Sequence, residues 1–379
     1  MTGREALGSG FEKSDGLRVS IAGGGTGGHV IPALAIAREL RDGHAAEVRF
    51  VGTARGLETR LVPQAGFHLD LVRSGQLKNV SMATRLHTAI DLPLGVMECV
   101  RLLRDFRPHV VVGVGGYASG PAMLAAILLH LPTLAFEPNA VPGLANRLVG
   151  RWVSAAAVNF LQTQRYFRNA RVTGIPVRAD FFTIAPKSVA AQLRLLVFGG
   201  SQGARVLNVA MPKIARRLLD QFTDLDILHQ AGERHVHSTT EAYAHAGLVV
   251  EPYARRIRVQ PYLDQMPREF AAADLLLCRS GASTMAELGA AGRASLLVPF
   301  ALAADDHQCR NAEVFLQAGA ARMLTEAELA DPERLLNELS RLLADPKVLR
   351  TMGERARTLA RPDAACQIAS MVVDLARRK

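Results

Sequence analysis

Residues 17–29 read Leu17-Arg-Val-Ser-Ile-Ala-Gly-Gly-Gly-Thr-Gly-Gly-His29. An apolar run with two β-branched residues ends in a glycine-rich turn. The apolar residues that follow, as far as Leu40, recur with the 3.6-residue period of a helix. A strand, a glycine-rich turn and a helix begin a Rossmann-like domain. This stretch therefore predicts such a domain from Leu17 on.

The same layout occurs a second time in the chain. Residues 193–203 read Leu193-Arg-Leu-Leu-Val-Phe-Gly-Gly-Ser-Gln-Gly203, and a helical pattern runs from Ala204 to Leu219. We therefore predict an α/β protein of two Rossmann-like domains, with the active site in the cleft between them. Prolines between Gly174 and Pro186 mark the junction.

Short apolar runs alternate with helical patterns in both halves, as βαβ units require. The predicted domains are residues 17–178 and 179–362, preceded by a loose tail of residues 1–16. The final helix, residues 363–379, is expected to pack on one of the two domains, and packing back on the first domain is one option. Further strands are expected at Val48–Val51, Val110–Val114, Leu131–Phe136, Ala155–Val158, Asp226–Gln230, Ile257–Val259, Asp274–Cys278 and Ser295–Val298.

The positive charge is concentrated in the first half of the chain. Residues 1–178 hold 20 Lys and Arg against 12 Asp and Glu, whereas residues 179–379 hold 25 against 23. An excess of this kind indicates an anionic partner: nucleic acid, an anionic membrane or a phosphate-bearing substrate. The alternative is a basic surface that only contacts solvent.

The cysteines and the apolar runs indicate a cytoplasmic protein. Cys99, Cys278, Cys309 and Cys366 have neither metal-ligand nor CxxC spacing, which suits a reducing compartment. No signal peptide is predicted, and the longest apolar run, Pro121 to Leu129, is about half of a bilayer span.

Glycine-rich turns before helices bring backbone N–H groups onto an anion, so they predict a phosphate-bearing ligand. A third such turn runs from Gly113 to Gly120. The alternative is that the glycines only allow positive φ angles in tight turns. The turn at residues 23–28 matches a dinucleotide fingerprint, but the second strand ends Phe50-Val-Gly-Thr53 without the acidic residue that binds ribose. NAD is therefore not predicted, nor is a P-loop, which needs a Lys after the glycines.

Three further groups are candidates for contacts with a ligand. His29 follows the first turn and is expected to project into the cleft, or else to cap the helix. Glu287, in Arg279-Ser-Gly-Ala-Ser-Thr-Met-Ala-Glu287, could accept two hydrogen bonds from a ribose diol, or merely complement the helix dipole. Asp305-Asp-His-Gln308 fits no metal motif, so polar ligand contacts or a helix cap are predicted there. Neither a metal nor a cofactor is expected.

Together these motifs closely resemble the MurG family, the N-acetylglucosaminyltransferases of peptidoglycan synthesis. The resemblance runs in order from Leu17 to the last helix. It implies a GT-B fold and an inverting reaction that moves N-acetylglucosamine from UDP to the muramoyl 4-hydroxyl of lipid I, undecaprenyl-pyrophosphoryl-MurNAc-pentapeptide, giving lipid II. The segments that carry it are Gly24–His29, Gly113–Gly120, Gly199–Gly203, Arg279–Glu287 and Asp305–Gln308.

The resemblance also implies the residues that contact UDP-GlcNAc. Arg178 and the turn at Ser201 would neutralise charge on the leaving UDP in place of a metal. Leu263 would offer backbone groups to uracil, and Glu287 would hold the ribose. The full set is Thr26, Gly27, Gly28, Asn139, Arg178, Ser201, Leu263, Ala282, Ser283, Thr284, Met285, Ala286, Glu287 and Gln308.

The chain departs from the family at one motif. The family reads His-Glu-Gln-Asn, and this chain reads Phe136-Glu-Pro-Asn139, so a role of that His or Gln side chain has no counterpart. A general base must take the proton of the acceptor hydroxyl. His29 is the first candidate, because the ordinary pKa of histidine, about 6.5, lies near the working pH. Glu137 is the second.

The implied partners are UDP-GlcNAc, the lipid I acceptor and the anionic inner surface of the bacterial cell membrane, to which the enzyme would bind peripherally from the cytoplasm. Nucleic acid is not among them, and protein partners stay open. Residues 74–100 mix basic and apolar side chains and are candidates for the membrane contact, or for core. The alternative functions are another GT-B enzyme, such as a glycolipid glycosyltransferase or a UDP-sugar epimerase, and a non-catalytic sugar-nucleotide-binding protein.

Overall fold

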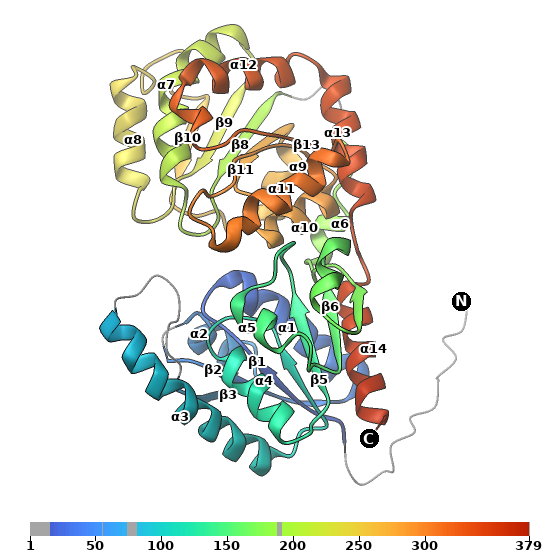
Figure 1. Ribbon diagram of the computed structural model, residues 1–379. Helices are drawn as coiled ribbons and strands as arrows, with labels where there is room; N and C mark the ends of the chain where they lie inside the picture. Colours follow the sequence, from blue (N-terminus) through green and yellow to red (C-terminus); the bar gives the residue numbers. More distant parts are fainter. Residues whose placement is uncertain (1–15, 55, 74–81, 188–191, 379) are drawn as a thin grey trace, which may run out of the picture. The chain divides into compact units, whose positions relative to one another are not determined.

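A computed structural model describes residues 16–54, 56–73, 82–187 and 192–378 (Figure 1). The chain forms two compact units and enters each of them more than once. The first unit holds the residues up to Glu137, Pro142–Thr173 and the residues from Ala365 on. The second unit holds Pro138–Val141 and Gly174–Ala364.

The first unit contains a parallel sheet with the strand order β3-β2-β1-β4-β5-β6-β7. Because all neighbouring strands are parallel, their carboxyl ends meet at one edge of the sheet. The inner strands are buried on both faces, as in other parallel sheets. The strands are β1 Arg18–Ala22, β2 Glu47–Gly52, β3 His68–Leu71, β4 Val110–Gly113, β5 Thr133–Glu137, β6 Ala155–Val158 and β7 Ala170–Val172.

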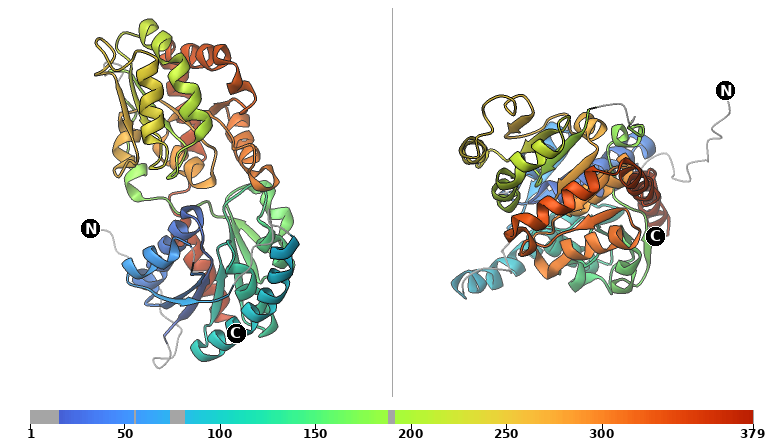
Figure 2. Two further views of the ribbon diagram at one scale, coloured as in Figure 1. Left: turned by 90° about the vertical axis from the view of Figure 1, so that its left-hand side faces the viewer. Right: turned by 90° about the horizontal axis from the view of Figure 1, so that it is seen from above.

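Helices cover both faces of this sheet (Figures 1 and 2). In α1 the residues Val30, Ala33, Ala37 and Leu40 are all buried, and their spacing of three or four residues explains why this segment is an amphipathic helix. The helices are α1 Gly27–His44, α2 Glu58–Gln64, α3 Met82–Phe106, α4 Ser119–Leu128, α5 Leu144–Val149, the 3₁₀ helix η1 Leu161–Tyr166 and α14 Ala364–Arg377.

The second unit contains a parallel sheet with the order β10-β9-β8-β11-β12-β13. Alternate residues of β8 belong to two different hydrophobic cores. Leu195 and Val197 pack with side chains of helices α7 (Arg205–Gln221) and α12 (Pro332–Leu343). Leu196 and Phe198 pack with those of α9 (Met266–Ala272) and α10 (Ala282–Ala291). The strands are β8 Arg194–Phe198, β9 Asp226–Gln230, β10 Ile257–Gln260, β11 Leu275–Cys278, β12 Ala294–Leu297 and β13 Ala321–Met323.

The helices of the second unit lie on both faces of its sheet (Figure 2). They are α6 Ala179–Phe182, α7 Arg205–Gln221, α8 Val236–His245, α9 Met266–Ala272, α10 Ala282–Ala291, α11 His307–Gln317, α12 Pro332–Leu343 and α13 Pro346–Thr358, with the 3₁₀ helices η2 Ala304–Asp306 and η3 Glu328–Ala330. Among the described residues, no helix combines the length and the hydropathy that a bilayer span requires.

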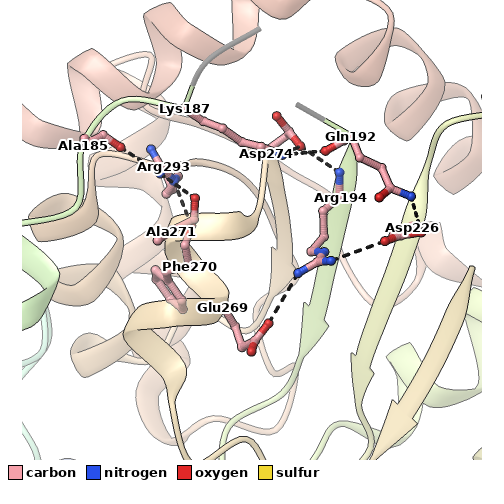
Figure 3. Close-up of polar contacts among 10 residues, drawn as sticks. All are labelled: Ala185, Lys187, Gln192, Arg194, Asp226, Glu269, Phe270, Ala271, Asp274 and Arg293. Atoms are coloured by element: carbon pink, nitrogen blue, oxygen red, sulfur yellow. Dashed lines mark hydrogen bonds and ion pairs between the residues drawn. The ribbon is translucent and has the colours of Figure 1, made fainter. Parts of the chain in front are cut away.

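Charged side chains close the amino-terminal edge of the second sheet (Figure 3). Asp274 accepts a hydrogen bond from the backbone of Arg194 at 2.7 Å and pairs with Lys187. The Arg194 guanidinium in turn contacts Asp226 at 3.3 Å. Arg293 is buried there and donates to three backbone carbonyls, those of Ala185, Phe270 and Ala271. These groups satisfy one another, so this edge is part of the structural framework of the unit.

Candidate active site

The strand order of each sheet reverses at one point, between β1 and β4 in the first unit and between β8 and β11 in the second. In open α/β sheets, ligands bind outside the carboxyl ends of the strands at such a point. The glycine-rich segments 23–28 and 113–120 follow β1 and β4, and residues 199–203 and 279–281 follow β8 and β11. Each unit therefore carries its predicted ligand loops where this topology favours a binding site.

The two glycine-rich turns of the first unit touch each other. The N–H of Gly24 donates to the carbonyl of Gly115 at 3.3 Å. A Cβ atom on Gly116 would lie 2.2 Å from the carbonyl oxygen of Gly24, and Gly115 and Gly116 have φ angles of 89° and 82°. Close packing and positive φ thus require glycine at these positions.

Glu58 is a buried carboxylate behind the first turn, and the sequence motifs did not reveal it. It is 1% exposed, and its Oε2 accepts from the N–H of Gly25 at 2.7 Å. Its Oε1 accepts from the backbone and the hydroxyl of Thr53 at 3.1 and 2.9 Å. These bonds fix the backbone of the turn. A Cβ atom would overlap Glu58 at three glycines, Gly24, Gly52 and Gly56.

His29 lies in the first turn of α1, beside both glycine-rich segments. Its Nδ1 is 3.5 Å from the hydroxyl of Thr26, the N-cap of the helix. A Cβ atom on Gly115 would lie 2.9 Å from the His29 Nε2, so the imidazole packs over the second turn. The side chains at Thr26 and His29 are not buried, and Gly27 and Gly28 are also accessible. The first unit thus gathers four of the predicted residues at the start of α1.

Glu137, the second candidate base, is held by other groups of the first unit. It ends β5 and is 2% exposed. Its Oε2 accepts from the N–H of Gly143 and from the Nδ2 of Asn146, each at 3.0 Å. Phe136, which stands where the family has His, is fully buried. This part of the motif therefore contributes to the core of the unit.

In the second unit, Ser201 lies exposed in the turn that follows β8. Gly200 and Gly203 flank it with φ angles of 83° and 72°. A Cβ atom on Gly203 would lie 1.8 Å from the carbonyl oxygen of Ala231, so the turn packs directly on the segment that follows β9.

Gln230 connects this turn to the predicted uracil segment, and no sequence motif indicated it. It is the last residue of β9 and is 1% exposed. Its Nε2 donates to the carbonyl of Gly200 at 2.8 Å, and its Oε1 accepts from the N–H of Leu263 at 3.1 Å. One buried amide thus fixes the distance between the turn of Ser201 and Leu263.

Helix α10 presents its positive end at the carboxyl edge of the second sheet. Gly281 is its N-cap, no side chain caps it, and its first turn has no acidic residue. Ala282 and Met285 are buried, whereas Ser283, Thr284, Ala286 and Glu287 are partly exposed. An uncapped helix start of this kind favours an anion.

The acidic residue of this helix, Glu287, has a perturbed pKa. Its surroundings raise the pKa of the carboxyl to about 7, because burial disfavours the charged form. The positive charge of Arg178, an exposed residue before α6, opposes that rise. Glu287 and Arg178 are therefore near enough to interact electrostatically.

Gln308 lies in the first turn of α11. Its Oε1 accepts from the N–H of Phe300 at 3.0 Å, and its carbonyl accepts from the buried hydroxyl of Ser280 at 2.8 Å. Asp306 is the N-cap of α11, without a side-chain capping bond. In the part of the chain that the structure describes, no group of three or more His, Cys, Asp or Glu is placed to hold a metal ion.

The family comparisons cover both units. The glycosyltransferase family 28 N-terminal domain matches residues 19–158, and the family 28 C-terminal domain matches residues 194–368. The chain is 29% identical to crystalline Acinetobacter baumannii MurG, with a TM-score of 0.79 over 94% of this chain and 99% of that one. With its two parallel-sheet units, this likeness confirms the predicted GT-B fold.

Two curated relatives share the same name, UDP-N-acetylglucosamine–N-acetylmuramyl-(pentapeptide) pyrophosphoryl-undecaprenol N-acetylglucosamine transferase. The protein of Solibacter usitatus is 44% identical over 94% of this chain and 96% of its own length. That of Anaeromyxobacter dehalogenans is 42% identical over 96% and 94%. Identity at this level along nearly the whole chain, with a family 28 domain in each unit, means that the chain belongs to this family of glycosyltransferases.

Proposed function

We propose that the chain transfers N-acetylglucosamine from UDP to the muramoyl 4-hydroxyl of lipid I, with inversion, to give lipid II. The observation that carries this proposal is the 44% identity to a transferase of that name over 94% of the chain. The arrangement of loops at both strand-order reversals supports it, because a donor and an acceptor that both carry diphosphates each need an anion site.

The donor would bind to the second unit. The start of α10 and the exposed Arg178 supply positive charge for the UDP leaving group, and Ser201 adds a hydroxyl and backbone N–H groups. Glu287 would accept hydrogen bonds from the ribose diol, and Leu263 would line the uracil. The other proposed contacts are Asn139, Gln308, the run from Ala282 to Ala286, and Thr26, Gly27 and Gly28.

His29 is the proposed general base. A general base needs a lone pair that can take the proton of the acceptor hydroxyl. Glu137 is almost completely buried, and its Oε2 already accepts two hydrogen bonds. His29 is partly exposed beside the two glycine-rich turns. Glu137 is then assigned to orienting the loop of Gly143, which begins α5.

The enzyme would act while bound peripherally to the cytoplasmic face of the cell membrane. Residues 94, 97, 101 and 104 of α3 recur at helical spacing, and all four side chains, Leu94, Met97, Arg101 and Arg104, are exposed. Apolar residues followed by basic ones on one helix face suit an anionic bilayer surface. Of the segment predicted for this contact, residues 74–81 and the side chains of residues 82–90 lie outside the described part of the chain.

The decisive experiment is transfer of labelled N-acetylglucosamine to a lipid I analogue, with a glycolipid without a muramoyl group as the control acceptor. We expect a β-linked disaccharide on the lipid I analogue alone. Preference for the glycolipid would favour another transferase. Conversion of UDP-GlcNAc without any acceptor would favour an epimerase, and tight UDP-GlcNAc binding with no conversion would favour a binding protein.

A further inference from the structure

Four residues of the chain, Pro138–Val141, are grouped with the second unit although the residues on both sides of them belong to the first. This segment contains Asn139, one of the proposed donor contacts. The backbone N–H and C=O groups of such a short segment need hydrogen-bond partners. The structure shows which side chain of the second unit supplies them.

That side chain is Asn311, which lies in the second turn of α11 and is fully buried. Its Oδ1 accepts from the N–H of Ala140 at 2.9 Å. Its Nδ2 donates to the side-chain oxygen of Asn139 at 3.3 Å and to the carbonyl of Ser280 at 3.1 Å. One amide therefore binds two segments that lie far apart in the sequence.

Both ends of the Asn311 amide are used in these bonds. Two donor hydrogens and one acceptor oxygen match an asparagine and no other side chain of this length. Aspartate would turn an acceptor toward the oxygens of Asn139 and Ser280, and leucine would remove all three of these hydrogen bonds.

The partners of Asn311 belong to segments that carry the proposed donor contacts. Ser280 is the residue before Gly281, the N-cap of α10, and its hydroxyl donates to the carbonyl of Gln308. Asn311 thus bonds directly to Asn139 and to Ser280 before α10, and Ser280 in turn bonds to Gln308.

We propose that Asn311 is a positioning residue for the sugar-nucleotide donor, which sets the side chain of Asn139 and the start of α10 relative to each other. It does not touch the donor itself, so it acts through Asn139 and α10. The proposal rests on the proposed function, because it takes Asn139 and α10 to be donor contacts.

The test is calorimetric binding of UDP-GlcNAc to the wild-type protein and to Asn311→Asp, Asn139→Ala and the double variant, which needs no acceptor. Asn311→Asp should weaken binding about 10-fold or more, since a buried bond to an amide is replaced by repulsion between acceptors. Asn139→Ala should also weaken binding. Because Asn311 acts partly through Asn139, the double variant should bind more tightly than the product of the two single effects predicts.

Arg293→Met is the matched structural control. Arg293 is also buried in the second unit and also makes three hydrogen bonds, all of them to backbone carbonyls, but at the opposite edge of the sheet (Figure 3). It should lower the melting temperature while leaving the affinity for UDP-GlcNAc within about twofold. If Asn311→Asp does not fold, the proposal can still be tested with Asn139→Ala, since that variant changes a partly exposed side chain and should fold.

Two results would overturn the proposal: an unchanged affinity in folded Asn311→Asp or in Asn139→Ala, or fully multiplicative effects in the double variant. Absence of UDP-GlcNAc binding by the wild-type protein would overturn it as well, together with the donor site. Wild-type protein that binds UDP-GlcNAc but transfers nothing to the lipid I analogue would contradict the proposed function alone, and the affinities would still decide the role of Asn311.

Discussion

At the scale of single residues, Glu287 is a proposed donor contact whose charge changes near neutral pH, since its pKa is about 7. Only the ionised carboxylate can accept two hydrogen bonds from a ribose diol without donating one. The KM for UDP-GlcNAc should therefore fall as the pH rises from 6 to 8. The stability of the free protein should change with pH in the opposite direction. Because the pKa of Glu287 in the folded protein lies above the ordinary value of 4.5, its protonation favours the folded state, and this contribution to stability is lost as the pH rises through about 7.

Substitution of Glu287 separates these effects. Glu287→Ala should raise the KM about 10- to 100-fold, because a hydrogen bond to a charged group contributes about 1.5–3 kcal/mol. Glu287→Gln should raise it less and remove its dependence on pH. Steady-state kinetics between pH 6 and 8.5 measure both, and an unchanged KM in Glu287→Ala would remove this residue from the ribose site.

His29→Ala tests the general base. It should lower kcat by about 10²- to 10⁴-fold while leaving the affinity for UDP-GlcNAc nearly intact. Glu137→Gln is the comparison, because it keeps the size of a side chain that is hydrogen-bonded in the first unit. Normal kcat in His29→Ala would move the assignment to Glu137 or to water, and loss of UDP affinity alone would make His29 a diphosphate ligand.

The limits of the sequence are visible at this scale. The motifs indicated His29 and Glu287, because a glycine-rich turn and the first two turns of the helix that follows it are local patterns in the sequence. Glu58, Gln230 and Asn311 were not indicated, since their partners lie elsewhere in the chain: Asn311 binds Ala140 across 171 positions. A buried carboxylate or amide in such a place has the same local sequence as an exposed one.

At the scale of elements, the central strands and the edge strand β10 were predictable from the sequence, whereas the edge strands β7 and β13 were not. β4 and β11 are continuous apolar runs that are buried along their length, and β8 is apolar and buried from Leu195 to its end. Each ends at glycine or at the start of a predicted ligand loop. β7 and β13 have three residues each and are partly exposed, so neither a run nor an alternation of apolar residues marks them.

The exposed face of α3 makes a prediction about membranes. Replacing Leu94 and Met97 by Glu should reduce binding to anionic vesicles, and replacing Arg101 and Arg104 by Ala should weaken it about 5-fold per residue and reduce its dependence on salt. Cosedimentation with vesicles of graded anionic content measures this. Val209→Glu, which changes an exposed residue of α7, should have no effect. Binding that ignores both salt and lipid charge would reject this surface.

A buried polar chain joins α7, β9 and α8 in the second unit. His229 Nδ1 lies 2.9 Å from the hydroxyl of Tyr243, and its Nε2 lies 3.0 Å from the side-chain oxygen of Asn208. Burial lowers the pKa of His229 to about 3. Because an unfolded histidine takes up a proton near pH 6.5, the stabilising contribution is complete above that pH and declines as the pH falls toward 3.

The free energy of unfolding should therefore decrease by up to about 1.4 kcal/mol per pH unit below pH 6.5 on account of this group. Urea unfolding of the second-unit transition at pH 7.5 and 5.5 measures the decrease. His229→Gln should reduce the difference between the two pH values, whereas His237→Gln, at a side chain that is 89% exposed, should not. An equal pH dependence in all three proteins would contradict the prediction.

At the scale of the whole molecule, the positive groups proposed for the donor diphosphate come from the protein: Arg178 and the start of α10. Transfer should therefore continue in EDTA at about the rate without it. Assays with EDTA, and with added Mg²⁺ as the control, measure this. Complete loss in EDTA that Mg²⁺ restores would show that a metal supplies the charge instead.

The order in which the segments of the two units follow one another along the chain has a consequence for folding during synthesis on the ribosome. The first unit includes the residues from Ala365 on, among them Ile368 and Val372, which are fully buried. The second unit is complete at Ala364. Domains fold as units while the chain emerges, usually the amino-terminal one first. Here the first unit begins to emerge first, but its last segment is synthesised last. Part of its apolar surface therefore stays uncovered during elongation until α14 leaves the exit tunnel.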